Sequence, residues 1–545
     1  MEDDEELRRR LKLLREKFDD GQIQIAEHLA DNFKQSFNAV RMSPDGTIDL
    51  SSVDGSIRSM ALAVTMVEDR QEIKSAASLA EIQKGYFERI SHMFDVPFNL
   101  MLKHGANPYS ISRMMLDDEQ YVEKNYSLIE PFISDLEEFW GAVSEPLKYH
   151  LQDTSSLKGV FGGEIFPSFG RNIASSTGLY LDTIVLSDPF LKSRELFKRW
   201  AKRKAVQNFV DLGTQVMGYK DLATADTDFP IVVILPFDSA LDNSFRESLV
   251  SVASNKALFH ASILFGRKFS EFEELKEFLS ALADPIRVTE LLADPSRLLF
   301  DTEWKGNPAA QITRAIEKYT PMVSGHPGQL ILEQSLSRMM QATDVSWQSS
   351  SVGGVPLIDA PTSWQYYNWS LEYGAVRDKK TDLPLHVSRG MQRLANTDMQ
   401  WLGDIPPDAL IEMRKEGALD EIRAMLSSGV EEVANLNPDN FFRTADKVYD
   451  NIENAFLDHQ AKINELKSKK WKFAGSDIGS WVVAGSIEVA SAFMGTPAWG
   501  IAGFAVSQVT DAPKLKDIPK KASDLKRESH ELSKSASGLL FKHKK

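Results

Sequence analysis

The sequence predicts a mainly α-helical protein of several domains that carries a small α/β insertion with three parallel strands. Three observations support this prediction: apolar residues recur at helical spacing over most of the chain, three short apolar runs alternate with helical segments near the middle, and 545 residues exceed the usual length of one domain. Apolar residues make up 42% of the chain, which is enough for packed cores, so a wholly disordered chain is excluded.

The first 150 residues predict amphipathic helices. Leu7, Leu11, Leu14 and Phe18 follow one another at spacings of four and three residues. Further helices are expected at about 57–76, 79–103, 107–117 and 118–150, and Pro97 should kink or end the second of these. Residues 1–152 are therefore expected to form an N-terminal helical domain.

A small α/β domain is expected at residues 153–282. Its predicted strands are 179–186, 231–235 and 258–265, and Asp188 with Pro189 has the pattern of a helix N-cap directly after the first strand. Strands that alternate with helices in this way favour a parallel sheet.

The remainder returns to helices. We expect a helical domain at 283–400, with a Ser/Gly loop at 349–354 followed by an aromatic-rich region. A helical module with a long charged helix is expected at 401–477. Residues 478–545 form the last part, a Gly/Ala-rich apolar hairpin at 481–509 with a basic tail. Each arm of the hairpin is shorter than the ~20 residues of an ordinary transmembrane helix.

Charge and cysteine content narrow the classes of function. The chain carries a net charge of -15, yet residues 512–545 hold ten Lys/Arg against four Asp/Glu, so the rest is strongly acidic. A strongly acidic protein repels nucleic acid, so binding of nucleic acid is not favoured outside local basic segments. The absence of Cys excludes thiolate metal sites and cysteine nucleophiles, and favours a reducing compartment. The first residues, MEDDEELRRR, lack the apolar core of a signal peptide, so a cytoplasmic location is expected.

Three carboxylates are the candidate catalytic residues. Asp188 and Asp238 follow two of the predicted strands, and Asp182 lies inside an apolar run, where a carboxylate must be exposed, paired or functional. Ligands of α/β sheets bind beyond the carboxyl ends of strands, where acids hold a divalent metal or act as a base. The alternative is that Asp188 and Asp238 are only N-caps. No His-based metal motif is present, and the glycines of 159–164 lack the spacing of a phosphate-binding loop.

A basic segment at 192–204 is the candidate phosphate-binding element. The segment contains seven cations, among them Lys198, Arg199 and Lys202, and one acid, Glu195. On a helix they would form a basic face able to contact phosphates. The alternative is a solvated face that pairs with the acidic body.

The C-terminal third resembles a helical module of uncharacterised bacterial proteins. The resemblance rests on Trp401 to Pro407 (WLGDIPP), Arg414 and the stretch Leu419 to Leu426, followed by a long charged helix and a Gly/Ala-rich end. It covers about a quarter of the chain and implies a bacterial protein with a role in stress or antiphage defence.

Two functions follow from these expectations, and the sequence leaves open whether the protein is an enzyme. The first is an intracellular sensor, effector or interaction protein whose segment 481–545 contacts a protein partner, its own copies or the surface of a membrane. The second is a metal-dependent hydrolase or nuclease, with Asp182, Asp188 and Asp238 as ligands of a divalent metal.

Overall fold

A computed structural model describes most of the chain, which forms two compact units. Unit 1 comprises residues 1–82 and 143–153, and unit 2 comprises 83–142 and 154–545. The described residues are 4–25, 27–43, 47–170, 172–302, 304, 306–319, 325–373, 386–387, 390–391, 405–436, 441–468, 472–473, 476–477, 531–532 and 534–542. The five-part division expected from the sequence stays a prediction.

Unit 1 is helical, as its periodicity predicts. It contains α1 (Asp4–Asp19), α2 (Glu27–Asn38), η1 (Leu50–Ser52) and α3 (Gly55–Ser75), with the first residues of α4 (Leu79–His104) and the last of α6 (Glu119–Asp153). Leu7, Leu11 and Leu14 of α1 are buried against Ile57 and Ala61 of α3. The spacing of apolar residues in α1 therefore marks the face that the helix buries.

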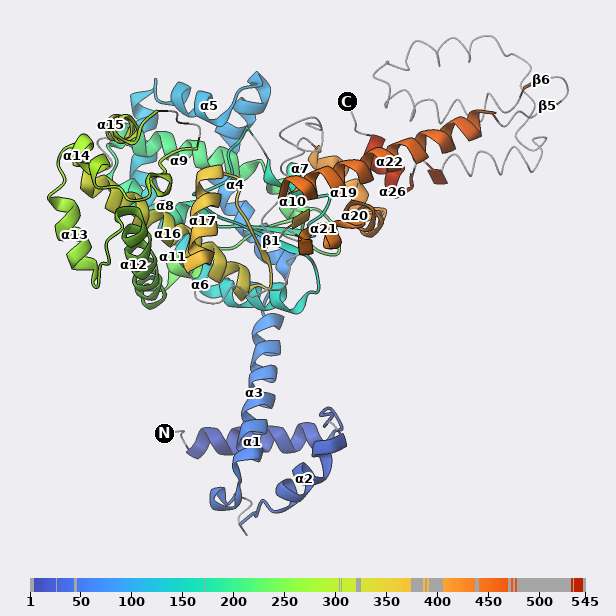
Figure 1. Ribbon diagram of the computed structural model, residues 1–545. Helices are drawn as coiled ribbons and strands as arrows, with labels where there is room; N and C mark the ends of the chain where they lie inside the picture. Colours follow the sequence, from blue (N-terminus) through green and yellow to red (C-terminus); the bar gives the residue numbers. More distant parts are fainter. Residues whose placement is uncertain are drawn as a thin grey trace. The chain divides into compact units, whose positions relative to one another are not determined.

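Unit 2 surrounds a small sheet with helices (Figure 1). Its strands are β1 (Lys158–Phe161), β2 (Thr183–Leu186), β3 (Val232–Ile234) and β4 (Val355–Leu357). The helices between α4 and β4, apart from α6, are α5 (Pro108–Met115), α7 (Ile173–Thr177), α8 (Pro189–Arg199), α9 (Lys202–Met217), α10 (Lys220–Thr224), α11 (Asp238–Leu241), α12 (Asn243–Phe265), α13 (Phe272–Ser280), α14 (Pro285–Glu290), η2 (Pro295–Arg297), α15 (Pro308–Tyr319) and α16 (Pro327–Ser351). After β4 come α17 (Pro361–Tyr373), α19 (Pro407–Lys415), α20 (Leu419–Ser427), α21 (Val430–Leu436), α22 (Phe441–Ser468), the short strands β5 (Lys472–Phe473) and β6 (Ser476–Asp477), and α26 (Ala536–Lys542).

The sheet is parallel, as predicted, but it has four strands in the order β3-β2-β1-β4. The strands expected at 179–186 and 231–235 are present as β2 and β3. The third expected strand, 258–265, is wrong because these residues form the end of α12. A short apolar run has the same composition in a buried helix as in a buried strand, so periodicity does not separate the two.

The two strands that the sequence did not indicate are β1 and β4. Each has at most four residues, and β4 contains Pro356, which is tolerated because β4 lies at an edge of the sheet. One other expectation needs correction: α16 extends to Ser351, so the Ser residues of the expected loop at 349–354 are helical. Of the two outcomes expected at Pro97, the helix does not end there but continues to His104.

The second edge strand, β3, is covered by a side chain. The amide of Gln83, at the start of the unit 2 part of α4, accepts from the main-chain N–H of Ile234 at 2.8 Å and donates to its carbonyl oxygen at 3.0 Å. Gln83 is fully buried. It supplies the two hydrogen bonds that a neighbouring strand would otherwise provide, and so closes this edge.

The C-terminal helices dock on the amino edge of the sheet. Helices α19 to α22 lie together with α26 in Figure 1, and α26 packs against α19, α20 and α22. Leu539 and Leu540 of α26 are buried, while Lys542 and Lys534 pair with Glu412 and Glu416. The apolar hairpin expected at 481–509 lies outside the described residues. Among the helices that are described, none has the length and apolar character needed to cross a membrane.

We expect Gln83→Met to destabilise the protein by about 2–4 kcal/mol, because two buried main-chain groups of Ile234 lose their partners while the side-chain volume is kept. Urea unfolding measures this loss, and hydrogen exchange should show faster exchange at the amide of Ile234. Gln120→Met, at an exposed position of α6, is the control and should change stability little. Equal stability of the two variants would contradict this role of Gln83.

Candidate functional site

The carboxyl edge of the parallel sheet gathers the charged groups that form the candidate site. The order β3-β2-β1-β4 places β2 on one side of β1 and β4 on the other. Connections that run in opposite directions from neighbouring strands leave a crevice at their carboxyl ends, and ligands of open α/β sheets bind there. Glu164 follows β1 and Asp359 follows β4, so both lie near the carboxyl ends of these two strands.

Lys192 lies at this edge of the sheet. It belongs to α8, which starts directly after β2, and its Nζ donates to the main-chain carbonyl oxygen of Glu164 at 2.6 Å. The ring of Phe237, which follows β3, lies under the ammonium group at 5.2 Å. Loss of hydration lowers the pKa of Lys192, and the negative charges of Asp344 and Glu164 oppose this shift.

Asp344 reaches the same edge from α16. Its side chain accepts a hydrogen bond from the hydroxyl of Ser239 at 3.0 Å, and the residue is 9% exposed. Burial raises the pKa of Asp344 to about 6; the charge of Asp238 adds to this shift, whereas Lys192 and Ser239 reduce it. A carboxyl group with this pKa exchanges protons near neutral pH.

Glu164 has a similar environment and its charge also acts on Lys192. Burial raises its pKa, and the nearby charge of Asp359 raises it further. Glu164 and Asp344 both act on Lys192, and each has a second acid near it, Asp359 and Asp238 respectively. Like charges placed close together favour retention of a proton by one member of each pair.

Arg338 fixes the loop after β1. Its guanidinium donates to the hydroxyl of Ser363 at 2.6 Å, and this hydroxyl donates to the carbonyl oxygen of Gly163 at 2.8 Å. Gly163 has a φ of +82°, and a Cβ on Gly162 would lie 2.4 Å from Val345. The two glycines thus allow close packing of this loop against α16 and α17. They do not leave the open cradle that a phosphate group needs.

Of the three predicted catalytic carboxylates, only Asp238 lies at this cluster. Asp182 precedes β2 and Asp188 follows it, so six residues of extended chain, about 20 Å, separate them. The shared metal site expected of the three acids is therefore not formed. Among the residues that the structure describes, no group of three or more His, Cys, Asp or Glu side chains could hold a metal ion.

Asp182 and Asp188 have structural partners. Asp182 accepts from the main-chain N–H of Leu157 and binds Arg414 and Arg423 of the C-terminal helices, and all three charged side chains are mostly buried. Asp188 is fully buried and caps α8, accepting from the N–H groups of Phe190 and Leu191 and from Trp140 Nε1 at 2.9 Å. Burial raises the pKa of Asp188, and these hydrogen bonds oppose the shift.

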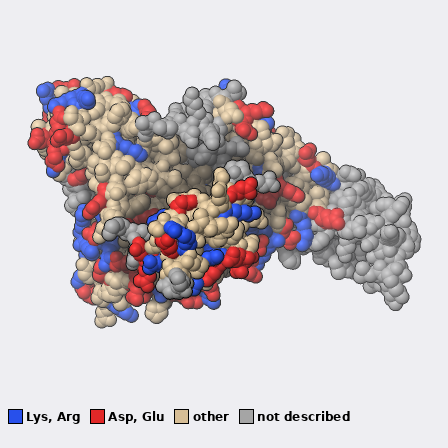
Figure 2. All heavy atoms as spheres, turned by 90° about the horizontal axis from the view of Figure 1, so that it is seen from below, with Lys and Arg blue, Asp and Glu red and all other residues tan. Residues whose placement is uncertain are grey.

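The basic segment 192–204 is divided between two helices, because α8 ends at Arg199 and α9 starts at Lys202. Its side chains reach acidic residues spaced along α6. Arg194 pairs with Glu130 and Glu137, Lys202 with Glu123 and Arg203 with Glu119. Of the other predicted phosphate ligands, Lys198 pairs with Glu195, and Arg199 is exposed at the end of α8. Cations and acids are also interspersed on the face drawn in Figure 2.

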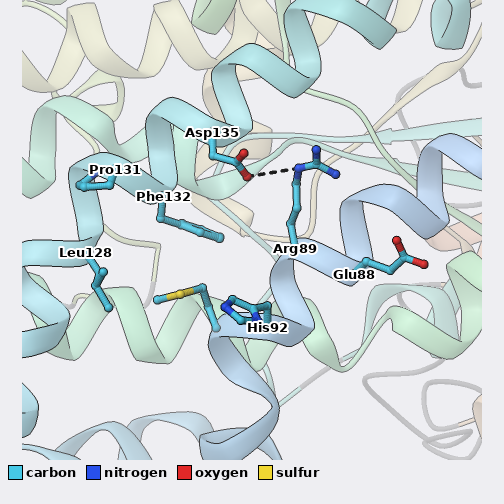
Figure 3. A pocket seen from close by; sticks show the side chains of 8 residues that line it. Glu88, Arg89, His92, Leu128, Pro131, Phe132 and Asp135 are labelled. Carbon is cyan, nitrogen blue, oxygen red and sulfur yellow. Dashed lines mark ion pairs between the residues drawn. The ribbon is translucent and has the colours of Figure 1, made fainter.

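Two clefts lie away from this edge. One, of about 480 Å³, lies between α4 and α6; Figure 3 shows its apolar side chains Leu128, Pro131 and Phe132, and Arg89, which forms an ion pair with Asp135 at 3.2 Å. The other, of about 620 Å³, lies at the amino edge between the sheet and the turn that joins α19 to α20. Its lining includes Asp182 and Arg414, which already neutralise each other.

Sequence reasoning missed four members of the cluster: Glu164, Lys192, Asp344 and Asp359. Lys192 was counted only as one cation of the basic segment. Asp344 offered a signal, because it stands beside Ala342 and Val345 on a buried part of α16, where an unpaired carboxylate is costly. Glu164 and Asp359 gave none, since the strands that they follow were not recognised.

No family model matches this chain, and no match to it was found among curated proteins or solved structures.

Replacing Asp344 should change how stability depends on pH. Its pKa is about 6 in the folded protein and about 4 in an unfolded chain, so the folded state binds the proton more tightly and stability falls as pH rises from 4 through 6. We expect Asp344→Asn, which cannot ionise, to gain roughly 2.4 kcal/mol over the wild type between pH 4 and pH 7.5.

Urea unfolding at the two pH values measures this gain. Glu247→Gln, at an exposed position of α12, is the control and should differ from the wild type by the same small amount at both. If the free energy of unfolding of Asp344→Asn relative to the wild type does not grow with pH, ionisation of the Asp344 carboxyl group does not destabilise the fold.

Proposed function

We propose that this protein binds a small, uncharged molecule bearing hydroxyl groups at the carboxyl edge of its sheet, and that Asp344 exchanges a proton with it. The observation that carries the proposal is that two buried acids, Asp344 and Glu164, both act on Lys192, with Asp238 near Asp344 and Asp359 near Glu164. Glu164 and Asp359 follow β1 and β4, and the carboxyl ends of such neighbouring strands are the usual place for a ligand in an open α/β sheet.

The charge of the cluster favours an uncharged ligand. Asp344 and Glu164 are buried acids at this edge, and a phosphate group would place further negative charge next to them. Hydroxyl groups donate hydrogen bonds to carboxylates and bring no repulsion. The amino-edge acids do not offer the same chemistry, because Asp182 is bound by Arg414 and Arg423.

Near neutral pH the buried carboxylate of Asp344 lowers the stability of the fold, and this cost also supports a functional role for the residue. Burying a titratable group without a full countercharge costs free energy, and such costs concentrate at sites whose chemistry requires them.

Matched pairs of ligands test this proposal. We expect dihydroxyacetone and D-ribose to bind saturably in saturation-transfer NMR, and their phosphate monoesters to bind at least about tenfold more weakly because of repulsion by the carboxylates. The double variant Glu164→Gln/Asp359→Asn should weaken binding of the neutral ligands. It should also reduce the difference in affinity between the neutral and the phosphorylated ligands.

Tighter binding of the phosphate monoesters by the wild type would contradict the proposal and favour the hydrolase expected as an alternative from the sequence. Asp226→Asn/Asp228→Asn, two changes at the amino-edge cleft, is the matched control and should leave binding unchanged.

A second candidate function is that of a sensor or effector that acts through residues 481–509. It is favoured by the docking of α26, because the chain returns to α19, α20 and α22 after this segment and buries Leu539 and Leu540 there. The segment is thus bracketed by two anchored helices, α22 and α26. This second proposal includes that the protein is bacterial, that it acts in antiphage or stress defence, and that it associates with a membrane.

Two deletions separate a structural from an effector role of the segment. Removing 478–545 also removes α26, so we expect exposed apolar surface on α19 and α20 and a protein that aggregates. Replacing only 481–509 by a flexible linker keeps α26 and should leave a folded protein. If that second variant also loses binding to anionic liposomes in flotation assays, the segment contacts membranes; liposomes that never bind the intact protein would contradict the membrane role.

A further inference from the structure

The cleft between α4 and α6 has the properties of a second binding site. It encloses about 480 Å³, and its walls are mainly apolar, with Leu128, Pro131 and Phe132 from α6 and Met93 from α4. Arg89 and Asp135 form an ion pair next to these side chains (Figure 3). A cleft of this volume, with apolar walls and a few polar groups, is typical of sites for small molecules.

The buried wall of the cleft is held in place by an aromatic cluster. The ring centroid of Phe132 lies 5.1 Å from that of Phe190, 5.4 Å from that of Phe209 and 5.7 Å from that of Phe94. Phe132 is 7% exposed, so nearly all of its surface packs inside the protein. A wall fixed in this way needs little reorganisation when a ligand enters.

Two prolines leave hydrogen-bond acceptors beside the cleft. Pro97 of α4 has no N–H, so the carbonyl oxygen of Met93, a lining residue, lacks its usual helical donor. Pro131 of α6 has the same effect on the carbonyl oxygen of Ser127, which directly precedes the lining residue Leu128. Main-chain oxygens of this kind favour a ligand that donates hydrogen bonds.

The cation of the cleft already has partners. Arg89 donates to the carbonyl oxygen of Gly85 at 3.0 Å, and the ring of Phe139 lies 4.5 Å from its guanidinium. Its Nε pairs with Oδ2 of Asp135 at 3.2 Å. The Asp135 side chain is 55% exposed, so it can accept from a ligand as well, and Glu88 adds a second carboxylate to the lining. These charges favour a cationic ligand over an anionic one.

We infer that this cleft binds a small amphipathic amine. The apolar body of the amine packs against Leu128 and Phe132, and its ammonium group donates to Asp135 and to a carbonyl oxygen freed by a proline. The cleft and the carboxyl edge of the sheet have no residue in common, so this inference does not depend on the function proposed above.

Three indole compounds with different charges test the inference: tryptamine is a cation, 3-methylindole is neutral and indole-3-acetate is an anion. Isothermal titration calorimetry with the intact protein measures the affinity of each. We expect tryptamine to bind roughly fivefold more tightly than 3-methylindole, because an exposed carboxylate contributes modestly to binding of a cation. Indole-3-acetate should bind at least about tenfold more weakly than tryptamine, since the two acids repel it.

Replacing one carboxylate should reverse this preference. Asp135→Asn should reduce the affinity for tryptamine roughly fivefold and leave that for 3-methylindole unchanged. It should raise the affinity for indole-3-acetate, because Arg89 loses its countercharge. Glu138→Gln removes an exposed acid of α6 that does not line the cleft, so it is the matched control and should leave all three affinities unchanged.

The methyl group of Met93 reports where the amine binds. In protein with isotope-labelled methionine methyl groups, tryptamine should shift the NMR signal that Met93→Leu removes, whereas dihydroxyacetone should not. Binding of dihydroxyacetone without binding of tryptamine would overturn this inference and leave the function proposed above intact. Equal affinities for the three indole compounds, or tryptamine binding that leaves the Met93 signal unshifted, would overturn it as well.

Discussion

The short parallel sheet of unit 2 is buried, and every polar group at its borders must find a partner inside the protein. The amide of Gln83 closes the edge at β3, because no further strand among the described residues covers it. At the amino edge, Asp182 accepts from the N–H of Leu157 and binds two arginines, which attaches the C-terminal helices to the sheet. At the other end of β2, Asp188 caps α8 and orients it from the buried core. The position of Lys192 depends on that capped helix.

The two edges of the sheet differ in how their charges are balanced. Asp182 is matched by Arg414 and Arg423, so the amino edge serves as a docking surface within the chain. At the carboxyl edge, burial shifts the pKa of Asp344, Glu164 and Lys192. Groups kept in such an environment cost stability, which is the physical reason to place the function there.

The basic segment shows how the same residues acquire a different role once the fold is known. Read along the sequence, its cations form a block able to bind phosphate. In the fold they face Glu119, Glu123, Glu130 and Glu137 of α6, which lies about sixty to ninety residues earlier in the chain. These pairs are exposed, so each contributes little to stability, yet together they reduce the positive field of the segment.

The sequence by itself determined the mainly helical class, the apolar face of α1, the parallel strands β2 and β3, and the N-cap at Asp188, because these features depend on spacing and composition within a few residues. It did not determine β1 and β4, the nature of 258–265 or the members of the site. Strands of three or four residues carry too little pattern, and an apolar run fits a buried helix as well as a strand. Tertiary structure alone decided that Asp182 meets two arginines more than two hundred residues away and that Glu164, Lys192, Asp344 and Asp359 meet at one edge. Their proximity arises from the crossover of β4 to the far side of β1, which local sequence does not encode.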